Sequence, residues 1–339
     1  MSLTVVWQLT RECDLGCTHC APLPSRADSH ELTTYEAYRT LDQIARVAPE
    51  RFVISGGDPL ARKDIFELVQ YARRRGMEPA VMVSPTRRLS AENVNGLRAN
   101  GLTRLIFGLN ASSAQRHDAT TGVSGSYSTT IRGLRWARDA RLAIEINTLI
   151  TRETVSDLAA IAEMIDAFRI DAWNVYFLVP VPASRVNESL TPEQAESAFA
   201  ALSAIASISK YRVRVLEAPE YRLHLLQKSD WPDFTGYVDN SEIADEVAFI
   251  TADGDVRPSE FLPVSGGNLR EQSLKTILGS SALFRSLRDR SRLTGKCRHC
   301  EYRTACGGSR ARAWATTGDM FASDPLCAYQ PGALSAAAG

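Results

Sequence analysis

Short aliphatic runs that recur through the first half of the chain constrain its fold more than any other feature. Six such runs alternate with longer amphipathic segments. Their length and composition are typical of buried parallel strands, and regular alternation with helices predicts a parallel sheet. We therefore expect an α/β fold built on a partial (β/α)6 parallel barrel, with strands at residues 4–10, 51–55, 79–84, 104–109, 143–150 and 173–179.

The pattern changes after residue 190. A helical segment covers residues 190–208, and two further strand-like segments, at 211–218 and 246–259, look isolated. The second contains a turn at Asp253 and Gly254, which predicts a β-hairpin. We predict a boundary near residue 235: residues 1–235 form the barrel with its following helical segment, and residues 236–339 form a small C-terminal module of a β-hairpin plus helix.

Charge and hydropathy narrow the class of protein. The chain has 39 basic and 39 acidic residues, which argues against nucleic acid or an anionic membrane as the main partner and favours a small-molecule substrate. No stretch is apolar enough for a signal peptide or a membrane span, so we expect a cytoplasmic protein. Seven cysteines in a reducing compartment indicate metal ligands or catalytic groups rather than disulfides.

Three of these cysteines, Cys13, Cys17 and Cys20, follow the first predicted strand. Active sites of parallel barrels lie at the carboxyl ends of the strands, so this position favours chemistry. A structural zinc ion would need a fourth ligand, and none stands nearby in the sequence. A [4Fe-4S] cluster on three thiolates would leave one iron open. The segment SGGDP (55–59) follows the second strand, and its glycines either let the backbone approach a ligand or form a tight turn.

Together the two motifs resemble the signature of the radical S-adenosylmethionine (SAM) superfamily, C-x3-C-x2-C after the first strand and GGE/GGD-P after the second. The resemblance extends from Val5 to Tyr329. It implies that Cys13, Cys17 and Cys20 hold a [4Fe-4S] cluster whose open iron is chelated by SAM. SAM would be cleaved to a 5′-deoxyadenosyl radical that abstracts a substrate hydrogen, with an electron donor such as flavodoxin or ferredoxin.

The same resemblance suggests which residues bind SAM. Gly56, Gly57 and Asp58, followed by Pro59, would lie at its methionyl amino group. Many relatives carry Ser-Leu-Asp-Gly at the end of the fourth strand, where this chain has GLNA (108–111). Further candidates for the SAM or substrate pocket are Ser84, Gly108, Asn110, Asn147, Leu178 and Val179. Ser84 and Asn147 could equally be satisfied polar groups of the barrel, and for Leu178 and Val179 aliphatic filling of the barrel is the favoured alternative.

A second cysteine set, Cys297, Cys300, Cys306 and Cys327, has the spacing C-x2-C-x5-C-x20-C. Spacing alone allows a zinc site. The segment also resembles the SPASM and twitch extensions of radical SAM enzymes, which carry auxiliary iron–sulfur clusters. Two positions where a full SPASM module has cysteines are Ser259 and Arg310 here, and both belong to the first auxiliary cluster. The resemblance therefore implies one auxiliary [4Fe-4S] cluster with four protein ligands, and two clusters in all.

A fully ligated auxiliary cluster suits electron transfer, which favours dehydrogenation or decarboxylation of the substrate. No leader-binding domain precedes the barrel, so we expect a small polar metabolite of sugar, nucleoside or tetrapyrrole type. A ribosomal peptide presented by a partner protein, a radical epimerase and a non-catalytic iron–sulfur protein are the alternatives. Tyr176, Glu260 and Glu145 are our candidates for catalytic groups; other candidate substrate contacts at strand ends are Lys63, His117, Asn174, Arg185 and Glu217.

Overall fold

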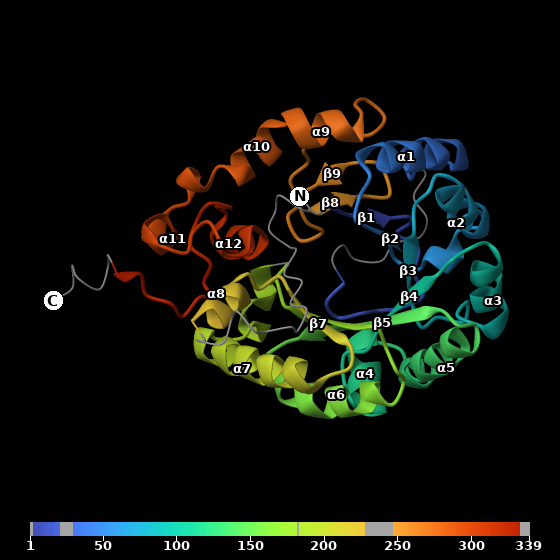
Figure 1. The fold of residues 1–339 in the computed structure, drawn as a ribbon, viewed down its shortest axis with the longest axis horizontal. Helices are drawn as coiled ribbons and strands as arrows, with labels where there is room; N and C mark the ends of the chain where they lie inside the picture. The colour runs from blue at the N-terminus through green and yellow to red at the C-terminus, as the bar shows by residue number, and fades with distance from the viewer. Residues whose placement is uncertain (1–2, 21–29, 182, 228–246, 333–339) are drawn as a thin grey trace.

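The computed structural model describes residues 3–20, 30–181, 183–227 and 247–332. Its centre is one nine-stranded sheet in the order β7-β6-β5-β4-β3-β2-β1-β8-β9. All neighbouring strands are parallel except β8 and β9. The sheet curls into a half-barrel (Figure 1). The strands are β1 (Thr4–Gln8), β2 (Arg51–Ser55), β3 (Pro79–Val83), β4 (Arg104–Gly108), β5 (Ala143–Ile150), β6 (Ala172–Phe177), β7 (Arg212–Leu216), β8 (Val247–Ile250) and β9 (Val256–Arg257).

Helices cover the outer, convex face of this sheet, as βαβ connections require (Figure 1). They are α1 (Thr34–Val47), α2 (Ile65–Arg74), α3 (Ala91–Ala99), α4 (Ala114–Thr121), α5 (Ser126–Asp139), α6 (Leu158–Asp166) and α7 (Pro192–Ile208), followed by the short α8 (Glu220–Leu226). Two of them begin at capping boxes, formed by Thr33 with Glu36 and by Thr191 with Gln194. The large apolar core lies between the helices and the sheet.

The parallel barrel predicted from the sequence is confirmed, but the prediction that residues 211–218 and 246–259 are isolated is wrong. Strand β7 pairs in parallel with β6, and β8 pairs in parallel with β1, so each extends one edge of the barrel sheet. The hairpin of β8 and β9 is confirmed. The predicted boundary at residue 235 lies outside the described residues.

The C-terminal part of the chain crosses the open side of the half-barrel. Helices α9 (Leu274–Ser280) and α10 (Ala282–Arg288) follow the hairpin and lead to α11 (Gly295–His299) and α12 (Arg310–Thr317) (Figure 1). A small second core joins this region to the barrel, because Val179 packs with Leu262, Leu287 and Ala311. The C-terminal cysteines are thereby held near the carboxyl ends of β6 and β7.

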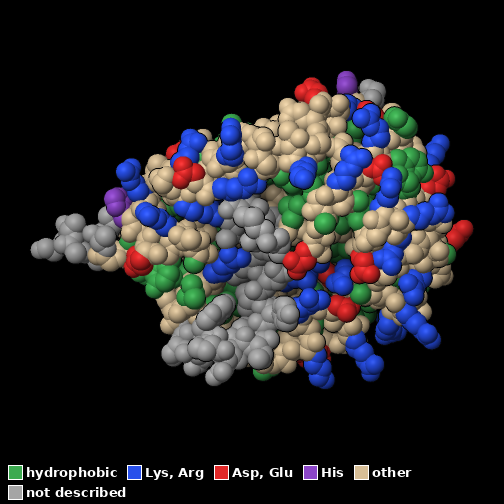
Figure 2. Space-filling model, turned by 45° about the horizontal axis from the view of Figure 1, so that its top comes forward, with side chains coloured by type: hydrophobic (Ala, Val, Ile, Leu, Met, Phe, Trp, Pro, Cys, Tyr) green, Lys and Arg blue, Asp and Glu red, His purple; other side chains and the backbone are tan. Residues whose placement is uncertain are grey.

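Basic and acidic side chains are interspersed over the face shown in Figure 2. No helix in the described part of the chain has the length and apolar character that a bilayer crossing requires.

Candidate active site at the carboxyl ends of the strands

The loop that carries Cys13, Cys17 and Cys20 rests on the two glycines that follow β2. The Gly57 N–H donates to the Thr10 carbonyl at 2.8 Å, and the Asp58 N–H donates to the Glu12 carbonyl at 2.7 Å. A Cβ at Gly57 would lie 2.5 Å from the Glu12 carbonyl oxygen. Gly56 has a φ of 144° and approaches the Thr10 carbonyl equally closely. Only glycine fits this contact, so the Gly-Gly pair positions the cysteine loop.

Asp58 and Ser84 support the Gly-Gly backbone on which this loop rests. The Asp58 carboxylate is fully buried and accepts hydrogen bonds from the Leu60 N–H (3.1 Å) and the Thr86 hydroxyl (2.6 Å). With Pro59 it caps a 3-10 turn at Pro59–Ala61. Ser84 donates to the Gly57 carbonyl at 2.6 Å. These three residues therefore hold the Gly-Gly backbone in place, and none of them lines the cavity described below.

The other side of the cysteine loop contacts the end of α4. The N–H groups of Gly16 and Thr18 donate to the carbonyls of Thr121 and Thr120, both at 3.0 Å. Gly122, with a φ of 70°, closes this contact, because a Cβ there would lie 2.6 Å from the Gly16 carbonyl oxygen. The loop is thus fixed between β2 and α4.

The three thiols of this loop lie close enough to influence one another. Burial and then the Cys13 thiol raise the pKa of Cys17 to about 11. Burial, then Cys17 and Cys13, and finally Glu260 raise the pKa of Cys20 to about 12. Thiols that resist ionisation in the bare protein become thiolates once they coordinate a metal. A partly buried set of three such groups fits an iron–sulfur cluster with one open iron.

A cavity of about 300 Å³ runs through the half-barrel beside this loop. Its wall includes Cys20, Gly56 and Gly57. Among the polar candidates predicted from the sequence, Asn110 and Asn147 line it, as do the apolar Leu178 and Val179. Both amides are partly engaged: Asn110 Oδ1 accepts from the Leu149 N–H at 3.0 Å, and Asn147 Oδ1 accepts from Asn174 at 2.8 Å.

The residues predicted to act in catalysis or to contact substrate divide into those that line the cavity and those that do not. Tyr176 and Asn174 both line the cavity, as their alternation on β6 predicts. Glu260 lines it too, and burial, followed by the charge of Glu217, raises the pKa of Glu260 to about 7. Lys63 is exposed, His117 is buried beside Asn110, and Arg185 pairs with Glu188 at 3.1 Å; none of these three lines the cavity.

Glu145 occupies a different place from the one we expected for a catalytic group. It lies near the amino end of β5, fully buried, and forms ion pairs with Arg51 (2.5 Å), Arg214 (3.2 Å) and Arg104. Asn174 donates to it at 3.1 Å. Desolvation opposes ionisation, but the arginines outweigh it and hold the pKa of this carboxyl well below its usual range. Glu145 is therefore a structural counter-charge that joins β2, β4, β5 and β7.

The second cysteine set is carried by α11, by the connection from α11 to α12 and by the loop after α12. Cys297 and Cys306 are buried, while Cys300 and Cys327 are half-buried. The Cys297 N–H donates to the Ser323 hydroxyl at 3.3 Å, and the Gly308 N–H donates to Cys306 Sγ at 3.4 Å. No disulfide joins the seven cysteines. Across the described ranges, no three His, Cys, Asp or Glu groups are arranged to hold a single metal ion.

Ser259 and Arg310, which the resemblance places where a first auxiliary cluster would have cysteine ligands, both form hydrogen bonds. The Ser259 hydroxyl donates to Glu217 Oε1 at 3.0 Å. Arg310 is 4% exposed, and its guanidinium donates to the carbonyls of Gly308, Met320 and Ala322 at 2.8–3.1 Å. Hydrogen bonds thus tie together the segments that hold these two positions, and Ser259, Glu217 and Arg310 all line the cavity.

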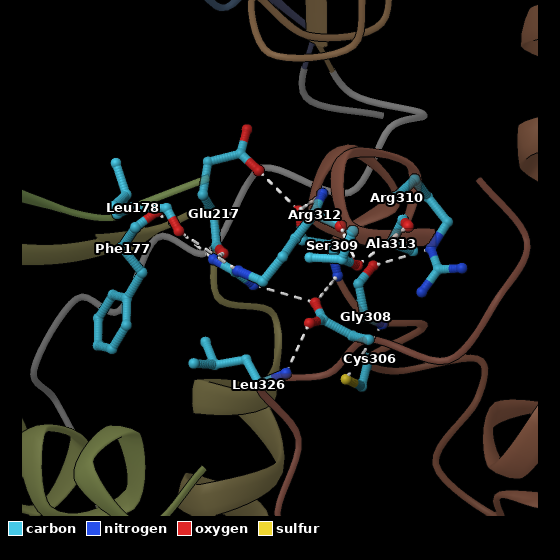
Figure 3. Close-up of polar contacts among 12 residues, drawn as sticks. Phe177, Leu178, Glu217, Cys306, Gly308, Ser309, Arg310, Arg312, Ala313 and Leu326 are labelled. Carbon is cyan, nitrogen blue, oxygen red and sulfur yellow. Dashed lines mark hydrogen bonds and ion pairs between the residues drawn. The ribbon is translucent and has the colours of Figure 1, made fainter. Parts of the chain in front are cut away.

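A buried polar network links this region to the barrel (Figure 3). Arg312 pairs with Asp324 at 3.0 Å and donates to the carbonyls of Phe177, Leu178 and Glu217 at the ends of β6 and β7. The Ser309 N–H donates to Asp324 at 2.6 Å. The Ser309 hydroxyl donates to Glu217 at 2.8 Å. Arg312 and Asp324 belong to no recognised motif, so sequence analysis did not identify either as a functional residue.

Comparison with known proteins agrees with this geometry. A family model for the radical SAM superfamily matches residues 7–165, and a model for an iron–sulfur cluster-binding domain (SPASM) matches residues 242–301. The chain is 32% identical to the AdoMet-dependent heme synthase of Methanosarcina barkeri, over 97% of both chains. It is 28% identical to the PqqA peptide cyclase of Rhodopseudomonas palustris, over 97% of this chain and 87% of the relative.

A solved structure shares the fold. Streptococcus suis SuiB bound to S-adenosylmethionine superimposes with a TM-score of 0.76 at 14% identity, covering 97% of this chain and 78% of SuiB.

Proposed function

Because the chain belongs to the radical SAM superfamily and carries an iron–sulfur SPASM domain, we propose that it oxidises or decarboxylates a tetrapyrrole. The observation that carries this proposal is the cavity of about 300 Å³ in the half-barrel, whose wall includes Cys20 and Gly57 at one place and Glu260 and Ser309 at another. A substrate in this cavity would touch both the wall formed by Cys20 and Gly57, where SAM would bind, and the wall formed by Glu260 and Ser309, next to the second cysteine set. The heme synthase relative supports a tetrapyrrole over a sugar or nucleoside.

The chain's own residues would bind and orient the cofactors. Cys13, Cys17 and Cys20 would hold one [4Fe-4S] cluster, and Cys297, Cys300, Cys306 and Cys327 a second. With SAM and a reducing electron from a flavodoxin or ferredoxin, the first cluster supplies 5′-deoxyadenosyl radical chemistry. Gly56 and Gly57 line the cavity beside Cys20, where their backbone groups could contact SAM.

The SAM-cleavage experiment tests the reaction. Anaerobically reconstituted protein, SAM and dithionite are incubated with coproporphyrin III or its iron complex, and 5′-deoxyadenosine and the tetrapyrrole mass are measured. We expect a tetrapyrrole that has lost carbon dioxide or hydrogen, in step with 5′-deoxyadenosine. The C13A/C17A/C20A variant should form neither product. Undiminished 5′-deoxyadenosine from that variant contradicts the proposal.

Iron content tests the cluster count. Two [4Fe-4S] clusters correspond to roughly eight irons per chain, and removal of either cysteine set should leave roughly four. Stoichiometric zinc retained by the C-terminal set would establish a zinc module there and exclude that set as an electron conduit.

The outcome of the radical step follows from the cysteine count. An epimerase commonly returns a hydrogen atom from a free thiol, whereas three plus four cluster ligands use all seven cysteines of this chain. We therefore favour loss of an electron or of carbon dioxide over epimerisation. A product made in deuterium oxide that differs only by one inverted carbon and one deuterium would contradict this.

A peptide substrate is the second candidate, and the PqqA peptide cyclase relative favours it. If the substrate is a peptide, added tetrapyrroles should leave the rate of 5′-deoxyadenosine formation at the value measured without substrate. A peptide encoded beside the gene should raise that rate.

A further inference from the structure

A strongly basic segment runs from α10 to the loop after α11. Residues 285–303 contain seven Lys and Arg residues and two Asp and Glu residues, a net charge of +5, whereas the whole chain is neutral. Within the mixed surface of Figure 2, blue side chains gather at the left of the view, where Figure 1 places α10 and α11. The charge balance of the chain as a whole therefore hides one basic surface.

The arginines of this segment present their charge to solvent. Four of them are exposed and form no ion pair with any residue in the described part of the chain: Arg285, Arg292, Arg298 and Arg303. Exposed arginines elsewhere do have acidic partners; Arg75 pairs with Asp42 and Arg270 with Glu36, both at 2.6 Å. The basic segment therefore carries positive charge that the chain itself does not neutralise, and such a surface attracts and orients anionic partners.

This charge lies beside the second cysteine set. Cys297 stands between Lys296 and Arg298 in α11, and the Lys296 ammonium donates to the carbonyl of Cys327. Arg303 donates to the Arg298 carbonyl at 3.2 Å, so these two arginines are neighbours in space. A molecule docked on the basic segment would therefore lie against the part of the chain that carries these cysteines.

The basic segment and the substrate cavity meet the second cysteine set through different residues. None of residues 285–303, all of which the structure describes, lines the cavity. Gly308 does line it, and the Gly308 N–H donates to Cys306 Sγ at 3.4 Å. The set is thus reached from the cavity at one place and from the exterior at another, as a relay between a buried substrate and an external electron carrier requires.

The electron count of the proposed function requires such a carrier. Each turnover uses one electron to break a C–S bond of SAM, and the substrate then loses one hydrogen atom to the resulting radical. The substrate radical loses one further electron, together with carbon dioxide or a proton, and the second cluster receives this electron. The electron must leave before the next turnover, so an oxidised one-electron carrier is the necessary co-reactant.

We propose that the basic segment 285–303 is the docking surface of an acidic one-electron carrier protein, of flavodoxin or ferredoxin type, which removes the electron from the second cluster. This inference rests on the second cluster of the proposed function. Arginine suits the role because its guanidinium binds the carboxylates of an acidic protein surface in a defined geometry. Nucleic acid or an anionic membrane would also be attracted to this charge, but neither accepts an electron.

The test uses the full-length C13A/C17A/C20A protein, in which only the second cluster remains. The reduced protein is mixed with oxidised flavodoxin or ferredoxin, and reduction of the carrier is followed by stopped-flow absorbance. Calorimetry gives the dissociation constant for the oxidised carrier. We expect the rate and the affinity to fall as salt is added, because screening weakens the attraction. Arg285→Glu combined with Arg303→Glu should lower both about tenfold or more at low salt.

The matched control combines Arg132→Glu with Arg135→Glu, which makes the same change in net charge on the exposed side of α5. It should leave the rate and the affinity close to those of the parent. Iron content and midpoint potential are measured for every variant, so that an altered cluster is not mistaken for lost docking.

Equal rates and affinities in the parent and both double variants would overturn this inference and leave the proposed function intact. So would binding of DNA or phosphatidylserine vesicles that the changes at Arg285 and Arg303 abolish while reduction of the carrier is unchanged. Absence of any [4Fe-4S] centre in the C13A/C17A/C20A parent would overturn both the inference and the proposed function.

Discussion

At the scale of single residues, three buried glutamates have three different environments. Glu145 is surrounded by arginines, Glu217 by serine hydroxyls and Arg312, and Glu220 by Asp324 and Arg312. Burial alone would raise the pKa of each carboxyl. Neighbouring charges decide the result, because the pKa of Glu145 is lowered whereas those of Glu217 and Glu220 are raised.

The structural role of Glu145 can be tested by Glu145→Gln. The change leaves Arg51, Arg104 and Arg214 without their shared counter-charge, and breaking a buried ion pair costs about 3–5 kcal/mol. We expect a loss of stability of that order in urea unfolding, whereas Glu163→Gln at an exposed site should change it by less than about 0.5 kcal/mol. Unchanged stability together with lost SAM-dependent activity would instead identify Glu145 as a catalytic residue.

At the scale of elements, the cysteine loop owes its position to glycines in two neighbouring connections. Gly56 and Gly57 follow β2, and Gly122 ends α4. Each allows a backbone-to-backbone contact that any side chain would block, and Gly56 and Gly122 also have a φ that other residues rarely adopt.

Gly122→Ala separates these two effects. It introduces a Cβ 2.6 Å from the Gly16 carbonyl oxygen and should displace the cysteine loop, lowering bound iron from roughly eight to roughly four per chain. Gly76→Ala is the matched control, because Gly76 also has a left-handed φ (80°) but open space around its Cα. Both variants should lose about 1 kcal/mol from backbone strain. Equal iron content in the two variants would show that the loop tolerates the contact.

At the scale of the whole molecule, Arg312 joins the barrel to the C-terminal region. Its guanidinium reaches carbonyls at the ends of β6 and β7 and also pairs with Asp324, which lies three residues before Cys327 (Figure 3). This buried side chain therefore helps, with the apolar contacts of Val179, to hold the C-terminal region against the barrel.

Arg312→Met removes this link while preserving most of the side-chain volume. It leaves Asp324 buried without its cation, so we expect a loss of about 3–5 kcal/mol in urea unfolding. The C-terminal region should also become more sensitive to limited proteolysis. Arg135→Met, on an exposed turn of α5, should do neither. Wild-type stability and proteolysis in Arg312→Met would mean that the apolar contacts of Val179, Leu262, Leu287 and Ala311 suffice to hold the region.

The sequence by itself determined the six barrel strands and the spacing of both cysteine sets, because each is a periodic or regularly spaced pattern of neighbouring residues. The sequence pattern identified β7 and β8 as strands. It did not identify their partners β6 and β1, because these pairings join residues far apart in the chain, and a local pattern carries no information about such contacts. The same holds for the surroundings of Glu145, Glu220, Arg310 and Arg312. A charged residue carries no sign of burial in its own sequence neighbourhood, and its role depends on which distant groups the folded chain brings to it.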